Sequence, residues 1–255
     1  YNSNNNKSAG HDIQCNPVVV DGIIYTPVVG GFVVAIDGFT GEEIWRSEKF
    51  KNNDVARRGI LYWNGDNSPQ IFFNDASKLI SLNAKTGKKT KSFGKNGYIK
   101  TGYSKITPVI YDNKIIVVSW RKTLEVYDAY TGATEWKYFF GDQSNKRNGG
   151  KKYENDKGGN PWGGISLDSE RGLVFITTGN PSGYFNGLKR PGRNKNSNSI
   201  IAIDIKNKKE LWNFQETAHD IWNLDLPAPP ILTSIIRNEK LIDVVITVTK
   251  RGNTL

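Results

Sequence analysis

The chain has 255 residues, of which 37% are hydrophobic, and its 26 glycines favour a loop-rich β protein over a helical one. Its formal net charge is +10, but the lysines are spread over turns and one loop, with no RNP, zinc-finger or helix-turn-helix pattern, so we expect no nucleic-acid partner. The one cysteine, Cys15, excludes an intrachain disulfide and a cysteine-based zinc site. No run of about 20 apolar residues predicts a transmembrane helix.

The first elements along the chain are short apolar strands joined by tight turns. Residues 17–25 and 108–118 each contain two apolar runs separated by an Asp-Gly or an Asp-Asn pair, the pattern of a β-hairpin. Residues 31–36 read as a further strand. We find no convincing amphipathic helix, so the pattern predicts an all-β protein.

One motif recurs along the chain. It contains an Asp, a Thr-Gly pair and a Trp at residues 35–45, and it returns at 126–136 and in altered form at 202–212, with a weaker copy at 82–88 that lacks the Trp. In chain order, the copies at 35–45, 82–88 and 126–136 follow one another at intervals of roughly 45 residues. This is the length of a four-stranded propeller blade. A polar insertion at 141–159 lengthens the last interval.

The motif has a physical logic. The Asp caps a tight turn, Thr-Gly supplies a hydroxyl acceptor and a positive φ, and the Trp can pack between neighbouring blades. We therefore predict a β-propeller of four-stranded antiparallel blades. Residues 1–255 are expected to form one partial propeller domain of about four to five blades. Because the chain has no Met and stops just after a strand and a turn signal, we expect an internal fragment truncated at both ends.

The motif and three longer stretches resemble the dehydrogenases that depend on pyrroloquinoline quinone (PQQ), the quinoproteins. Residues 58–63, 160–181 and 212–230 match segments of that family in order, and Thr249-Lys250-Arg251-Gly252 follows at the expected distance. The similarity is closest to the glucose- and quinate-type branch and covers essentially the whole chain. It implies an eight-bladed propeller that holds PQQ near its axis, with Ca²⁺ or another divalent or lanthanide cation as Lewis acid. It also implies oxidation of an alcohol, a sugar or a polyol by hydride transfer to the quinone.

The resemblance assigns three residues to the cofactor. Trp162 matches the aromatic floor under the quinone, and the glycines beside it suggest that its face is left open. Arg58 and Lys250 match cationic donors to the carboxylate and carbonyl oxygens of PQQ, which a forked guanidinium and a point ammonium suit in different ways. The alternatives are a Trp that packs between blades and two solvated surface charges.

Two residues match positions that bind the cation. Asn180 stands at the amide ligand of the family's Gly-Asn-Pro, and Asp225 stands where some members, notably the lanthanide-using ones, place an extra carboxylate. Oxygen donors of this kind suit a hard cation. The alternatives are an Asn that caps a turn and an Asp of a turn.

The chain departs from the family at the catalytic base. The Asp that directly follows the Trp in the family's His-Asp-x-Trp-Asp is here Asn223, and a neutral amide cannot accept the hydroxyl proton. Asp220 and Asp225 are the carboxylates that could take over the role. The stretch 119–125 is also shorter than the family's loop, which supplies an acidic metal ligand, and Glu125 is expected to lie in a strand.

Two functions follow from these observations. The first is a periplasmic dehydrogenase that passes electrons to a quinone or a cytochrome, with any inner-membrane anchor lying outside this chain. The second is a non-catalytic propeller that serves as a binding or assembly scaffold. Asn223 favours the scaffold, whereas the presence of Trp162, Arg58, Asn180 and Lys250 favours the enzyme.

Overall fold

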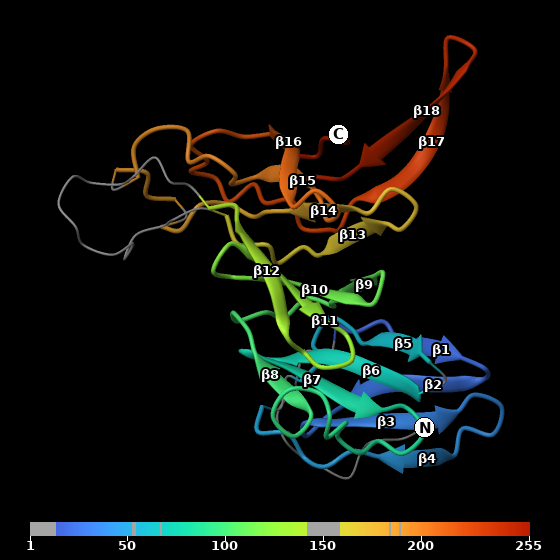
Figure 1. Cartoon of the computed structure of the whole chain (residues 1–255). Coiled ribbons are helices and arrows are strands. Elements are labelled where there is room, and N and C mark those ends of the chain that lie inside the picture. The colour runs from blue at the N-terminus through green and yellow to red at the C-terminus, as the bar shows by residue number, and fades with distance from the viewer. Residues whose placement is uncertain (1–13, 53–54, 67, 142–158, 184, 189) are drawn as a thin grey trace. The chain divides into compact units, whose positions relative to one another are not determined.

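The structure is a computed structural model that describes residues 14–52, 55–66, 68–141, 159–183, 185–188 and 190–255. Strands β1 to β18 make up its regular structure (Figure 1), and the described residues contain no helix, so none that could cross a membrane. The predicted all-β class is confirmed. Most of the predicted polar insertion, residues 142–158, lies outside the described part of the chain.

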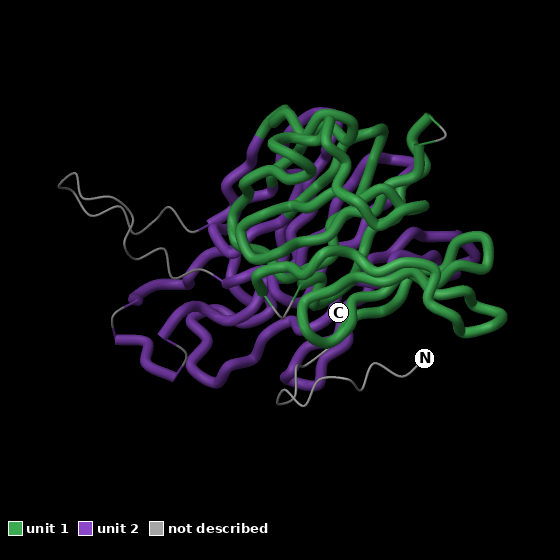
Figure 2. Tube along the Cα trace, turned by 90° about the horizontal axis from the view of Figure 1, so that it is seen from below, with its two compact units in different colours: residues 1–117, 125–136 green, residues 118–124, 137–255 purple. Residues whose placement is uncertain are grey.

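The chain separates into two compact units, coloured in Figure 2. The first comprises Tyr1–Val117 and Glu125–Trp136, and the second Val118–Leu124 and Lys137–Leu255. Each unit is described by itself below.

Two complete four-stranded sheets belong to the first unit. One has the order β1 (Val18–Val20), β2 (Ile23–Val28), β3 (Phe32–Asp37) and β4 (Glu43–Arg46). The other has the order β5 (Leu61–Gly65), β6 (Ser68–Asp75), β7 (Lys78–Asn83) and β8 (Tyr98–Lys100). Neighbouring strands are antiparallel and follow one another in sequence, as the repeat predicts.

The third sheet contains the boundary between the units. Its strands are β9 (Val109–Tyr111), β10 (Lys114–Ser119), β11 (Thr123–Asp128) and β12 (Thr134–Phe139). Only residues 120–122 join β10 to β11, so the connection is as short as the sequence indicates.

The second unit holds one four-stranded sheet and one hairpin. The sheet consists of β13 (Ile165–Asp168), β14 (Leu173–Thr177), β15 (Ser199–Asp204) and β16 (Lys209–Gln215). The hairpin consists of β17 (Ile231–Arg237) and β18 (Lys240–Ile246). Arg171, in the turn after β13, donates a hydrogen bond to Asp243 of β18 and so ties the hairpin to the sheet.

Local turn chemistry explains the tight hairpins. Asp21 and Gly22, between β1 and β2, have φ values of 49° and 77°. Asp112 and Asn113, between β9 and β10, have φ values of 47° and 55°. Positive φ at both central residues defines the two-residue turn whose twist matches the flanking strands, and Asp, Asn and Gly tolerate it best. Both predicted hairpins are confirmed.

The recurring motif also forms as predicted. Asp37 Oδ1 accepts hydrogen bonds from the backbone N–H groups of Phe39 (2.9 Å) and Thr40 (2.8 Å), and Gly41 has a φ of 76°. The indole of Trp45 donates to the carbonyl of Ala84 at 2.9 Å, and a Cβ at Gly87 would lie 2.3 Å from its ring. The Trp of the first sheet therefore docks on the turn of the second.

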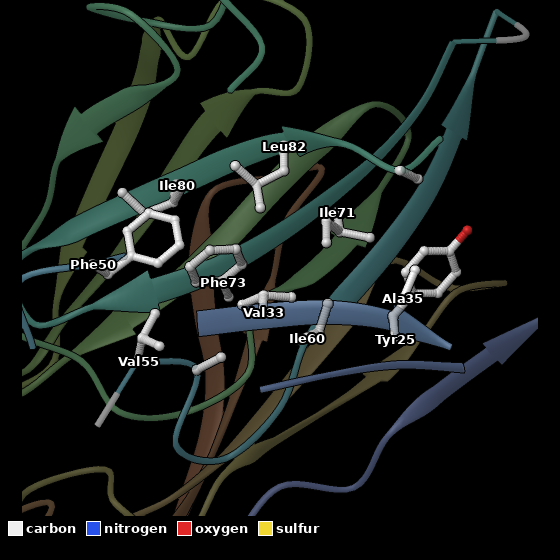
Figure 3. Close-up of a cluster of buried hydrophobic side chains, with 12 residues drawn as sticks. Tyr25, Val33, Ala35, Phe50, Val55, Ile60, Ile71, Phe73, Ile80 and Leu82 are labelled. Atoms are coloured by element: carbon white, nitrogen blue, oxygen red, sulfur yellow. The ribbon is translucent and has the colours of Figure 1, made fainter. Parts of the chain in front are cut away.

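One core cluster of the first unit lies between these two sheets (Figure 3). β3 contributes Val33, and β6 and β7 contribute Phe73 and Leu82, all three fully buried. Phe50 meets Phe73 edge to face, with ring centroids 5.3 Å apart. Burial of each such side chain contributes roughly 1.5–3 kcal/mol, so apolar packing holds these sheets face to face.

Candidate active site

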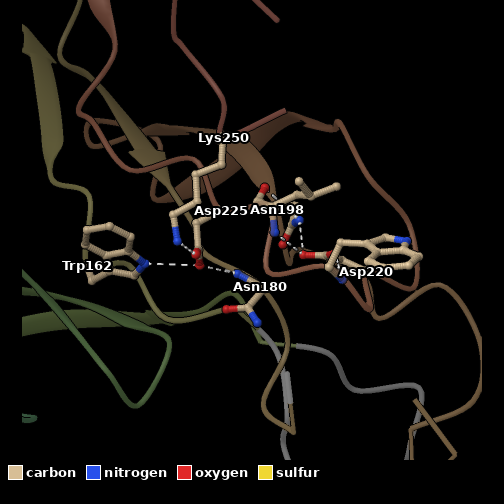
Figure 4. Close-up of polar contacts among 8 residues, drawn as sticks. Trp162, Asn180, Asn198, Asp220, Asp225 and Lys250 are labelled. Carbon is tan, nitrogen blue, oxygen red and sulfur yellow. Dashed lines mark hydrogen bonds and ion pairs between the residues drawn. The ribbon is translucent and has the colours of Figure 1, made fainter. Parts of the chain in front are cut away.

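Asp225 is the centre of a polar cluster in the second unit (Figure 4). Only 3% of the residue is exposed. Its Oδ1 accepts hydrogen bonds from the indole Nε1 of Trp162 (3.2 Å) and the backbone N–H of Asn180 (2.7 Å), and its Oδ2 is ion-paired with the ammonium of Lys250. The structure thus brings four predicted site residues together, and we call Trp162, Asn180, Asp225 and Lys250 the Asp225 cluster.

The cluster is assembled from the ends of strands. Trp162 precedes β13, Asn180 follows β14, and Lys250 follows β18. The backbones that carry these residues are bonded to one another: the N–H of Lys250 donates to the carbonyl of Asp225 at 3.1 Å, and that of Gly179 donates to the carbonyl of Asn160 at 2.9 Å. Main-chain bonds therefore fix the positions from which the side chains converge.

Glycines allow this close approach. A Cβ at Gly179 would lie 2.3 Å from Asp225 Oδ1 and 2.7 Å from Trp162 Nε1. A Cβ at Gly163 would lie 2.7 Å from the carbonyl oxygen of Leu226, and one at Gly164 would lie 3.1 Å from Pro229. The sequence suggested that the glycines beside Trp162 leave its ring face open. In the structure, they let the chain pack against the segment that follows Asp225.

Trp162 and Lys250 also contact each other directly. The Lys250 ammonium lies 5.5 Å from the centroid of the indole ring, within the range of a cation–π interaction. The Lys250 side chain keeps 37% of its surface exposed. An aromatic ring with an ammonium beside it can support a planar, anionic molecule and donate a hydrogen bond to it.

Asn180 has an amide that the fold does not use. The residue is buried, and the backbone N–H, not the amide, makes its bond to Asp225. Within the described residues, its side-chain Nδ2 is buried without a hydrogen-bond partner. A buried donor of this kind calls for an explanation, and an acceptor atom of a bound ligand is one. The amide thus has the chemistry and the freedom to contact one.

Asp220, one of the two carboxylates predicted to take over as base, is bonded to three nearby donors. Only 1% of it is exposed, and its carboxylate accepts hydrogen bonds from the backbone N–H groups of Trp222 and Leu224, each at 2.7 Å. The amide of Asn198 donates a third bond at 2.8 Å. With three donors on its two oxygens, Asp220 holds the turn that carries Asn223. It is poorly placed to accept a substrate proton.

A buried arginine supports the same turn. Arg190 is 1% exposed and donates to the backbone carbonyl of Asp220 and to the side chain of Asn194. Burial lowers the pKa of its guanidinium, while the nearby Asp220 acts in the opposite direction. Neither Arg190 nor Asn198 could be recognised from the sequence, because isolated polar residues in a loop carry no periodic signal.

Asn223 is held in the left-handed region, with a φ of 64°. Asn and Asp adopt this conformation more readily than most residues, so either would suit the backbone here. Its side chain makes no hydrogen bond within the part of the chain that the structure describes. Asp225, the other predicted stand-in for the base, is buried and paired with Lys250.

Two predicted residues lie in the first unit. Arg58 stands just before β5, beside Gly59, which bridges to Asn16. Its position relative to the Asp225 cluster stays a prediction. Glu125 lies in β11, as expected, and its carboxylate accepts hydrogen bonds from the backbone N–H of Gly102 (3.0 Å) and the hydroxyl of Tyr127. Burial and this contact raise the pKa of Tyr127. Glu125 is therefore bonded within its own unit.

Comparison with known families decides the relationship. The family described as "PQQ: Glucose/ethanol/alcohol dehydrogenase, beta-propeller domain" matches residues 1–255. The chain belongs to this family. The PQQ dehydrogenase resemblance and the propeller fold predicted from the sequence are both confirmed.

Relatives in the PQQ dehydrogenase family include alcohol- and glucose-type enzymes. The quinohemoprotein alcohol dehydrogenase of Comamonas testosteroni is 31% identical over 284 residues, which cover 97% of this chain and 39% of that protein. The quinoprotein glucose dehydrogenase A of Acinetobacter calcoaceticus is 24% identical, over 94% of this chain and 36% of that protein. The chain thus spans less than half the length of these relatives, and the predicted glucose/quinate branch stays a prediction.

Solved structures with a similar fold include the following. The crystal structure of the Comamonas testosteroni enzyme matches with a TM-score of 0.75 and 25% identity, over 93% of this chain and 40% of that one. A europium-containing methanol dehydrogenase matches with a TM-score of 0.73 and 22% identity, over 93% and 47%. BamB from Moraxella catarrhalis gives a TM-score of 0.51 at 12% identity, over 95% and 60%. The last two likenesses concern the fold alone.

Proposed function

We propose that this chain is part of a quinoprotein dehydrogenase that oxidises an alcohol, a sugar or a polyol. The observation that carries the proposal is the Asp225 cluster, in which the family's predicted floor, amide and cationic positions meet. The activity is proposed for the whole protein, because the chain covers 39% of the Comamonas testosteroni relative.

The residues of the cluster suit PQQ. When bound, PQQ supplies the quinone that accepts a hydride from the substrate carbon. Trp162 would support the flat ring system, and the exposed part of Lys250 would donate to one of its oxygens. Arg58 is proposed as a second donor. An ammonium beside an aromatic platform favours an anionic aromatic ligand over a neutral aliphatic one.

The residues suit a cation less completely. The amide oxygen of Asn180 and the carboxylate of Asp225 are hard donors of the kind that Ca²⁺ or a lanthanide prefers. When bound, such a cation would polarise a quinone carbonyl. The described residues hold no group of three or more His, Cys, Asp or Glu side chains that could bind a metal ion. A cation at Asp225 would compete with the Lys250 ammonium for this carboxylate.

The absence of a catalytic base should make the proposed dehydrogenation slow. Asn223 cannot accept the hydroxyl proton, Asp220 is bonded to three donors, and Asp225 is buried in an ion pair. The same observation favours the second candidate function, a non-catalytic propeller that acts as a binding or assembly scaffold. The likeness to BamB supports that alternative only as far as the fold.

The cellular context is also a proposal. We propose a periplasmic protein that passes electrons to a quinone or a cytochrome. Any inner-membrane anchor would lie outside the residues described here. The name of the Comamonas testosteroni relative, a quinohemoprotein, supports a haem partner for electron transfer. We also propose that the sheets described here are blades of one propeller domain that the longer protein completes.

Cofactor binding tests the proposal. Full-length protein is titrated with PQQ in the presence of Ca²⁺, and binding is followed by quinone absorbance and by the shift in unfolding temperature. We expect saturable binding that Trp162→Ala abolishes and Trp162→Phe partly restores. Reduction of an artificial acceptor with polyol substrates then separates the two functions. Binding without turnover supports the scaffold, and no binding of PQQ to folded protein contradicts the dehydrogenase.

A further inference from the structure

Asp225 has three donors, and they differ in how easily they can leave. The indole of Trp162 and the backbone N–H of Asn180 belong to segments that main-chain bonds fix in place. Lys250 reaches Oδ2 with a long side chain that is 37% exposed. Oδ2 is therefore the part of this buried carboxylate that can change partner, and the ammonium is the partner that can leave.

We propose that Lys250 occupies the position from which a metal ion would contact Asp225 Oδ2, so that the ammonium and the ion exclude each other there. The inference rests on the proposed cation site at Asn180 and Asp225. An ammonium at hydrogen-bonding distance from a carboxylate already neutralises it, and a metal ion placed beside that ammonium would be repelled by it. The ion must displace Lys250 to bind.

Lys250 also has a second partner, the indole ring of Trp162. Its ammonium lies 5.5 Å from the centroid of the Trp162 ring, so after leaving Asp225 it can keep its contact with the indole. This is the face on which we place the cofactor. Binding of the ion at Asp225 would thus release a donor toward the oxygens of the cofactor, and Lys250 would link the two binding events.

Terbium luminescence tests this without the cofactor or turnover. Tb³⁺ is a hard, oxygen-seeking ion, and the indole of Trp162, which bonds directly to Asp225, can sensitise its emission. PQQ-free, full-length protein is titrated with Tb³⁺ in the wild type, in Lys250→Met and in Asp225→Asn. We expect Lys250→Met to tighten Tb³⁺ binding by at least about fivefold, the lower range of typical couplings between sites. Asp225→Asn should weaken binding, with or without Lys250→Met.

Two further variants keep the test decisive. Lys240→Met removes an exposed lysine near the tip of the β17–β18 hairpin and should leave Tb³⁺ binding unchanged, which controls for the loss of one positive charge. Lys250→Gln keeps a hydrogen-bond donor beside Asp225, so it serves if Lys250→Met fails to fold, and it should tighten binding in the same direction.

The outcomes separate the inference from the proposal beneath it. Equal or weaker Tb³⁺ binding in both Lys250 variants, with weaker binding in Asp225→Asn, would overturn the exclusion and leave the cation site standing. Tb³⁺ binding that Asp225→Asn does not alter would overturn both.

Discussion

The core between the first two sheets and the polar loops of the second unit are held together by different forces. In the first unit, apolar side chains such as Phe73 fill the space between two sheets, and Trp45 docks on a neighbouring turn. In the second, polar side chains bond segments that lie far apart in sequence. The amide of Asn196, for example, donates to the carbonyl of Phe140, and the hydroxyl of Thr178 donates to the carbonyl of Asn196.

The difference shows what each unit can tolerate. Apolar contact is non-directional and roughly proportional to buried area, so many sequences of suitable volume would satisfy the first unit. A buried hydrogen bond needs one donor and one acceptor in a given geometry, and loss of either leaves the other unsatisfied. The polar loops of the second unit can therefore present chemical groups with precision, but at a greater risk from substitution.

Asn223→Asp should give the largest effect. It sharpens the comparison between the apolar core and the polar loops, because it changes the catalytic rate and not the packing. If Asn223 stands where the base is missing, the variant should raise kcat of the full-length protein loaded with PQQ and Ca²⁺ by about 10²–10⁴-fold, the usual contribution of general base catalysis. Steady-state reduction of an artificial acceptor measures it. Asn64→Asp, at an exposed position of β5 in the first unit, is the control and should change nothing. No gain from folded, PQQ-binding protein would contradict the assignment.

Phe73→Ala tests the apolar half of the comparison. The side chain is fully buried among β-strands, so its loss should lower the free energy of unfolding by about 3–5 kcal/mol, as measured in urea. Phe39→Ala is the matched control, because 98% of Phe39 is exposed and its loss should cost little. We expect PQQ affinity per folded molecule to be unchanged, and a loss of affinity in folded Phe73→Ala would break the separation between core and site.

Asp220→Ala tests the polar half. It removes the acceptor of two backbone N–H groups and of the Asn198 amide, so the free energy of unfolding should fall by about 1–3 kcal/mol or more. PQQ binding should weaken in parallel, because the same turn leads to Asp225. Asp220→Asn keeps one acceptor oxygen and should fall between wild type and Asp220→Ala. Equal stability in all three proteins would show that the turn does not depend on this carboxylate.

The smallest effect should be common to both units, because both contain the motif turn. The backbone N–H of Thr40 holds the pKa of Asp37 below its ordinary value of 3.8, and the side chain of Asn207 does the same for Asp204. A carboxyl whose folded-state pKa is lowered stabilises the fold above its unfolded pKa, and this contribution is lost as pH falls through the folded value.

Stability from these turns should thus be flat near neutral pH and decline only in acid below about pH 4. Urea unfolding at several pH values measures the decline, and Asp204→Asn should make it smaller. A variant that loses stability in acid as steeply as the wild type would contradict the role of Asp204.

Much of the fold could be predicted from the sequence because its causes are local. A turn such as Asp21-Gly22 is set by the φ values that these two residues tolerate, and the Asp37 turn by bonds to residues two and three positions away. The spacing between copies of the motif also predicts the length of a four-stranded blade. The site was predicted only through the family resemblance, which pointed to Trp162, Asn180, Asp225 and Lys250 one by one.

Their partners could not be predicted in this way. The bonds of Asp225 join it to residues 63, 45 and 25 positions away, and Arg190 reaches across 30 positions to Asp220. No local preference determines such pairs, since they depend on which strand ends meet after folding. The turns of this protein and the candidate residues of its site could thus be predicted from the sequence. The pairing of Asp225 with Lys250 was decided only when folding brought the two together and buried the carboxylate beside its counter-charge.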